Sequence, residues 1–117
     1  MAQAHTTVLL ADHKGNTRPK VVGDEYVVNA VVDVTSVVAA GSVIPASDFG
    51  LSTIHCATIT GYDLAHTARP SIEVSATGAY ESNTSLALVF TSMDGTNATL
   101  ADDANGNSVR LRVWGNL

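Results

Sequence analysis

The chain of 117 residues is long enough for one domain that folds without disulfides or metal ions. Hydrophobic residues make up 45% of it, charged residues 15% and aromatic residues 5%. So few charges leave much of the exterior to small polar and apolar side chains, which is typical of a subunit that is partly covered in an assembly. Six basic residues against eleven acidic ones give a formal charge of −5, which disfavours nucleic-acid binding by the whole domain.

The basic residues are concentrated near the start of the chain. Residues 1–20 hold three of the six basic residues and one acidic residue, whereas the other ten acidic residues lie in 21–117. The three are Lys14, Arg18 and Lys20. This pattern fits an arm that lies on an acidic neighbour, and charge alone leaves a solvated tail open as the alternative. A short apolar run at 7–11, followed by turn formers and Pro19, predicts an extended arm with one edge strand or a segment that pairs with a neighbour.

The strongest strand signal begins near residue 26. Alternate positions from there to residue 34 are apolar and mostly valine, and successive side chains of a strand point to opposite faces. Such a run is typical of a half-buried strand. Its inward side chains are Tyr26, Val28, Ala30, Val32 and Val34. The next segment, 39–50, is rich in turn formers and is interpreted as a linker.

A second strand is expected over 51–60. It would place Ile54 and Cys56 on one side, and Thr53, His55 and Ala57 on the other. Cys56 is the only cysteine, so an internal disulfide is excluded. Its place in an apolar strand predicts a buried thiol that acts as a small hydrophobe rather than as a nucleophile.

The second half of the chain alternates strand and turn signals. A loop is expected over 61–70, and long loops are often functional or interfacial. Strands are expected over 71–77, 85–92 and 108–114. Their inward side chains are Ile72, Val74 and Ala76, then Leu86, Leu88 and Phe90, and finally Val109, Leu111 and Val113. We therefore expect an all-β, single-domain antiparallel β-sandwich or jelly roll over 21–117, with the arm at 1–20.

The opposite side of the last expected strand carries Arg110, Arg112 and Trp114. Arginine and tryptophan are enriched at binding hot spots, so this face is a candidate for partner binding. The alternative is that Trp114 packs at the edge of the core while the two arginines pair with surface carboxylates.

Catalytic and metal-binding patterns are missing from the sequence. The four histidines have no metal-ligand spacing, and adjacent His55 and Cys56 cannot hold one ion without a bulge, because neighbouring strand residues point to opposite faces. The acidic turn at 102–107 lacks the glycine at the sixth position and the glutamate at the twelfth position of a calcium loop, and no serine lies in a nucleophile elbow. We expect a non-enzymatic protein without cofactor or metal. The sequence also shows no signal peptide and no apolar run of membrane-spanning length, so we expect a soluble protein made in a cytoplasm.

Three stretches, 26–33, 40–54 and 109–117, together resemble a group of small virion proteins of tailed bacteriophages. In that group a valine-rich strand precedes a linker of the form (A/G)G-x-(V/L)-x-A-x-x-(F/L)-G-L-x-x-I, and a later strand finishes on glycine. The most distinctive match here is Ala46-Ser47-Asp48-Phe49-Gly50-Leu51, and the last strand reaches Gly115. The resemblance covers 21–117 and leaves the basic segment outside it.

This resemblance implies a β-sandwich or jelly roll on the capsid exterior, acting as a decoration or cement subunit that binds the major capsid protein, often as a trimer. Other small β-proteins of these phages are parts of the neck, tail or fibre, so these positions in the virion remain alternatives. A carbohydrate- or receptor-binding module is the alternative, and it would need exposed rings from Tyr62, Tyr80 and Trp114. Neither nucleic acid nor membrane is an expected partner. The partner-binding candidates are Lys14, Arg18, Lys20, Tyr62, His66, Arg69, Arg110, Arg112 and Trp114.

Overall fold

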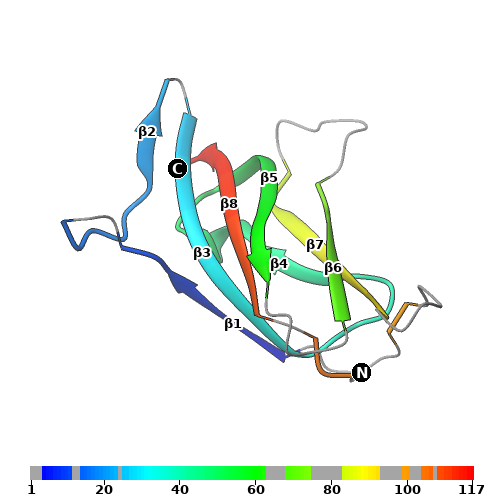
Figure 1. The fold of residues 1–117 in the computed structure, drawn as a ribbon. Coiled ribbons are helices and arrows are strands. Elements are labelled where there is room, and N and C mark those ends of the chain that lie inside the picture. Colours follow the sequence, from blue (N-terminus) through cyan, green and yellow to red (C-terminus); the bar gives the residue numbers. More distant parts are fainter. Residues whose placement is uncertain are drawn as a thin grey trace.

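Eight strands and one short 3₁₀ turn make up the regular elements in a computed structural model that describes residues 4–11, 14–23, 25–62, 68–74, 83–92, 99–100, 104–106 and 108–117. A five-stranded antiparallel sheet has the order β1-β3-β8-β5, with β2 also paired to β3, and a three-stranded sheet has the order β4-β7-β6 (Figure 1). The bounds are β1 Ala4–Leu9, β2 Lys20–Val22, β3 Glu25–Ser36, β4 Ser42–Pro45, η1 Ala46–Phe49, β5 Thr53–Tyr62, β6 Ala68–Glu73, β7 Ser85–Ser92 and β8 Ser108–Asn116. The two sheets pack together, which confirms the all-β sandwich.

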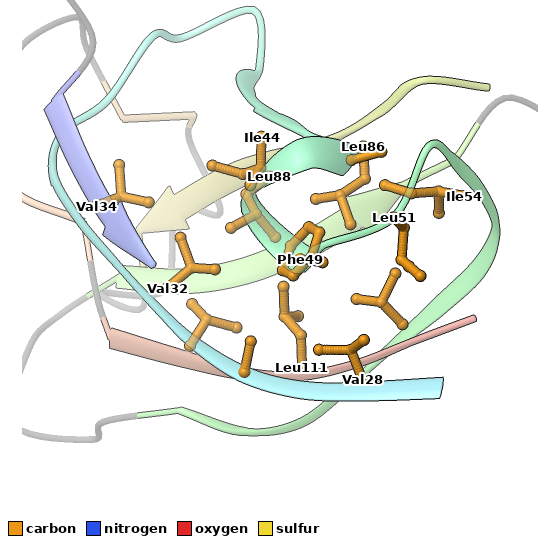
Figure 2. Close-up of a cluster of buried hydrophobic side chains, with 14 of the residues drawn as sticks. Val28, Val32, Val34, Ile44, Phe49, Leu51, Ile54, Leu86, Leu88 and Leu111 are labelled. Atoms are coloured by element: carbon orange, nitrogen blue, oxygen red, sulfur yellow. The ribbon is translucent and has the colours of Figure 1, made fainter. Parts of the chain in front are cut away.

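The interior between the sheets is built by side chains that alternate along β3, β7 and β8. Every second residue of these strands is buried, and the inward positions that the sequence predicts for them are confirmed, with Tyr26 half-buried at the start of β3. The labelled residues of Figure 2 come from both sheets and surround the ring of Phe49, which is fully buried. One continuous apolar cluster therefore joins the sheets.

The segment predicted as a linker, 39–50, is more ordered than its turn-forming composition indicates. It contains β4, which pairs with β7, and then η1, which carries Phe49 into the interior. Gly50 follows η1 with a φ of 75°, a left-handed conformation that glycine adopts at little cost, and its N–H binds the Ser47 carbonyl at 3.1 Å. The interpretation of 39–50 as a plain linker is therefore wrong.

Two irregularities change the faces of β5. The register to β8 shifts between Ile54 and Cys56, and again between Ile59 and Gly61. At each shift β5 carries one extra residue, as in a β-bulge. Cys56 is consequently exposed while Ile54 is buried, so the prediction of a buried thiol on the same side as Ile54 is wrong. Ala57, expected on the opposite side from Ile54, instead packs against the core.

Close contact between β5 and β8 depends on a residue without a side chain. Gly115 pairs with Ile54, and a Cβ atom at this glycine would overlap the carbonyl oxygen of Thr53. This explains why β8 has glycine at a position where its neighbours are bulky.

The N-terminal residues belong to the five-stranded sheet. β1 pairs with β3 over its whole length, so the expected short edge strand is present, but an extended arm that stands apart from the body is not confirmed. Two side chains of β1, His5 and Thr7, contact the same carboxylate oxygen of Asp48 in η1, each at 3.0 Å. These contacts connect β1 to the element that supplies Phe49.

The expected loop at 61–70 is shorter than predicted. β5 continues to Tyr62 and β6 begins at Ala68, with 63–67 outside the described residues. Pro70 lies inside β6, opposite Phe90, which is compatible with strand structure because β6 is the edge of its sheet and its outer side needs no ladder donor. The predicted strand at 71–77 therefore starts three residues earlier, and Ile72 and Val74 are half-buried against the core.

Candidate docking surface

The outward face of the five-stranded sheet carries the side chains that alternate with the buried ones, and we call it the outer face. Cross-strand pairing arranges it in rows, because paired residues of neighbouring strands project to the same side. One row holds Val27, Trp114 and Cys56, and the next holds Asn29, Arg112 and Thr58. A third row places Arg110 beside Val31. Arg110 and Arg112 are exposed, and the Nε of Arg112 donates to Asn29 Oδ1 at 2.9 Å.

The described residues between β1 and β2 lie at the β2 end of this face. The Leu10 N–H binds the Asn29 carbonyl at 2.9 Å, and Lys20 pairs with Val27 in the row of Trp114. Arg18 and Lys20 line one hollow together with Leu10 and Asn29. Lys14 joins them at a second hollow, which also includes Leu117 at the end of β8. Arg18 and Lys20 thus lie near the arginines of β8, because the hollow that they line and the hollow of Arg110 and Arg112 both include Asn29.

Among the described residues, the outer face and its β2 end carry more basic than acidic side chains. Arg110 and Arg112 lie on the face, Lys14, Arg18 and Lys20 line hollows at its β2 end, and Arg69 lies on β6 in the other sheet. Two acidic residues of β3, Glu25 and Asp33, also face outward. The described basic side chains are thus gathered on one part of a chain whose formal charge is −5. A concentrated patch of this kind attracts negatively charged partners.

A polar cluster lies at the end of the sheet where β3 and β5 begin and β8 ends. His55 Nδ1 lies 2.7 Å from Glu25 Oε2, and the Asn116 amide nitrogen lies 3.2 Å from His55 Nε2. Partial burial, together with the negative charge of Glu25, raises the pKa of the Cys56 thiol. A thiol with a raised pKa is a weak nucleophile, so this cluster does not activate Cys56.

Most of the predicted partner-binding residues come together on this surface. Lys14, Arg18, Lys20, Arg110, Arg112 and Trp114 lie on or beside the outer face. Tyr62 lines its far end, but the residue is half-buried and packs against the core. Arg69 is exposed on the other sheet, and His66 lies outside the described residues.

The structure places Trp114 on the outer face and gives Arg112 one described partner. Trp114 is half-buried, points outward between buried Val113 and Gly115, and is not among the half-buried side chains that pack against the core. The described partner of Arg112 is an amide, that of Asn29, rather than a carboxylate. Asn29 itself was missed as a site residue, although the mixed polarity on the outward side of β3 was a signal that could have found it.

Aromatic rings do not form an exposed platform on the described residues, where the large hydrophobic side chains exposed to solvent are Val8, Val21, Val43 and Leu117. Tyr80, the third ring that a sugar-binding module would use, lies outside them. In the same part of the chain, no three His, Cys, Asp or Glu residues are placed to hold a metal ion. None of the described helical segments has the length and apolar character needed to cross a membrane.

Comparison of the chain with protein-family models, curated proteins and solved structures found no match in any of the three.

Proposed function

We propose that this chain is a non-enzymatic structural protein of a tailed-bacteriophage virion, a decoration or cement subunit that binds the outside of the major capsid shell through its outer face. The observation that carries the docking role is the exposed arginine pair of the outer face, with three further basic residues at its β2 end, on a chain with a charge of −5. The phage assignment rests on the resemblance of 26–33, 40–54 and 109–117 to that group.

The physical requirements of a cement subunit support the proposal. Such a protein needs a rigid body, which the continuous apolar cluster between the sheets supplies without a disulfide. It also needs a surface whose charge complements the shell, since complementary potentials speed encounter and fix orientation. A homo-oligomer, with a trimer favoured, would repeat this surface around a symmetry axis of the shell.

Capsid binding by charge-deleted variants tests the proposal. We would compare the wild type with Lys14→Ala/Arg18→Ala/Lys20→Ala and with Arg110→Ala/Arg112→Ala, by co-sedimentation with expanded capsids of the phage that encodes the chain. Each set of substitutions should raise the Kd for capsids by about tenfold at low salt, which corresponds to about 1.4 kcal/mol of binding free energy. The difference from wild type should shrink as salt screens the charges.

Arg69→Ala is the matched control, because it removes an exposed arginine from the other sheet. It should bind capsids as the wild type does. Wild-type occupancy by both outer-face variants would refute the docking role. Retention of the wild type on purified tails or fibres, without capsid binding, would move the protein to another station in the virion.

A further inference from the structure

Four neighbouring hollows lead from the β2 end of the five-stranded sheet onto its outer face. The first is lined by Lys14, Arg18, Lys20 and Leu117, and it shares Arg18 and Lys20 with the second. The second and third share Leu10, Ala11 and Asn29. The third and fourth share Thr60 and Arg110, and the fourth ends at Tyr62 and Ser108. Consecutive hollows are therefore neighbours, and together they form a groove that runs from Lys14 and Arg18 past Asn29 to Arg112, Arg110 and Tyr62.

The walls of the groove come from elements far apart in the sequence. The β1–β2 connection forms one side, and β5 with Thr60 and Gly61 forms the other. The floor is β3 and β8, whose outward side chains alternate with buried ones.

The positive charges are spaced along this path. Lys14, Arg18 and Lys20 lie at one end, and Arg112 and Arg110 follow toward the other. Arg110 and Arg112 are two residues apart on one strand, so their side chains emerge about 7 Å apart. The Nε of Arg112 is held by Asn29, which orients the guanidinium and leaves its terminal nitrogens as donors for a ligand.

We propose that the groove binds an extended acidic peptide segment of a partner protein, with carboxylates at alternate positions. Alternate side chains of an extended segment repeat at about 7 Å, the same spacing as the two arginines of β8. Arginine and carboxylate form paired, charge-assisted hydrogen bonds. This binding mode rests on the proposed docking function and specifies the chemistry of the partner.

Single-stranded nucleic acid has a similar spacing of negative charge, but the groove fits it less well. Sequence-independent strands are held by rings on which bases stack. Among the residues that line the four hollows, Tyr62 is the one aromatic residue, and it packs against the core. Trp114 faces outward in the row of Val27, so the described part of this face offers one ring rather than a series of them. The formal charge of −5 also opposes a polyanion as the groove's occupant more than it opposes a short segment with a few carboxylates.

Peptide binding to the full chain tests the inference. The probe is a fluorescent ten-residue peptide with glutamate at alternate positions and serine between them, and binding is followed by anisotropy at low salt. Two control peptides replace glutamate by glutamine, or place the same glutamates in one block. The alternating peptide should bind at least about fivefold more tightly than the block peptide, and the glutamine peptide should show no binding.

Variants then place the peptide in the groove. Arg110→Ala/Arg112→Ala should weaken binding of the alternating peptide by about tenfold, whereas Arg69→Ala should leave it unchanged. Absence of binding, or binding that these two arginine variants do not distinguish, would overturn the inference. Tighter binding of a ten-nucleotide oligothymidylate than of the alternating peptide would also overturn it.

The result separates this inference from the proposed function. In one outcome, the capsid is bound through Arg110 and Arg112 while the peptide is not bound. That result would support the docking function and refute the groove as a peptide site. Peptide binding without capsid binding would support the groove as a peptide site and refute the capsid as the partner.

Discussion

The two faces of β8 have opposite physical roles. Val109, Leu111 and Val113 are fully buried between the sheets, whereas Arg110 and Arg112 alternate with them and are exposed. Burial of the inward side chains away from water stabilises the fold. The outward side chains present positive charge that can attract a partner. Because the two sets share one strand, stability and docking should be separable by substitutions only one residue apart.

The largest expected effect comes from the centre of the interior. Phe49→Ala should lower the free energy of unfolding by about 3–5 kcal/mol, because it leaves a cavity where the fully buried ring contacts both sheets. Urea unfolding followed by the fluorescence of Trp114 measures it. Val43→Ala, at a side chain that is 50% exposed, is the control and should change stability by less than about 1 kcal/mol. Equal losses in the two variants would contradict the assignment of Phe49 to the core.

A smaller but still large effect is expected where β5 and β8 come closest. Gly115→Ala should cost about 2–3 kcal/mol, since the added Cβ overlaps the Thr53 carbonyl and the two strands must separate. Gly61→Ala is the matched variant, because a Cβ there meets nothing within 4 Å. Thermal unfolding of both proteins checks the difference, and a Gly115→Ala protein as stable as Gly61→Ala would show that the strands are not so closely paired.

The outer face should tolerate substitution. Arg110→Ala/Arg112→Ala is expected to change the free energy of unfolding by less than about 1 kcal/mol, because both side chains are exposed and the described bond of Arg112 is to an exposed amide. Urea unfolding of the variant measures this. A large loss of stability would mean that the arginines stabilise the sheet. Weak capsid binding by the variant would then result from unfolding rather than from the loss of a docking contact.

The smallest effect concerns Cys56 and depends on pH. Burial and the charge of Glu25 raise the pKa of the thiol, so its reactive thiolate should form at a higher pH than in an ordinary cysteine. Glu25→Gln removes the negative charge and should move the midpoint of the alkylation rate to lower pH. Iodoacetamide labelling across a pH series measures the shift. A midpoint unchanged by Glu25→Gln would show that burial alone sets this pKa.

The sequence predicted the inward faces well because they depend on a period of two within one strand. Leu86, Leu88 and Phe90 needed no knowledge of any neighbouring strand. The exposed thiol of Cys56 could not be predicted in this way, since a bulge adds one residue and exchanges the two faces beyond it. Phe49 was missed as a core residue because its neighbours are turn formers. Such residues predict the local backbone conformation, but they do not show which side chain of the turn is buried.

The outer face was predicted only in pieces. Lys20 and Arg112 are separated by most of the chain, and they share a surface because β2 and β8 both pair with β3. Charge and residue type identified each group as a candidate for binding, but strand order decides whether they meet. Period-two alternation carries no information on strand order, so the groove could not be predicted from the residues that line it.

The position of β8 also has a consequence for the synthesis of the protein. β8 is the last strand along the chain, yet it lies between β3 and β5 and is the partner of β5 in the five-stranded sheet. During translation, β3 and β5 leave the ribosome with their facing edges unpaired, because β8 begins 55 residues after β5 begins (108 − 53). Unpaired edges of this kind join other chains, so the yield of folded protein should depend on how long these edges stay without β8.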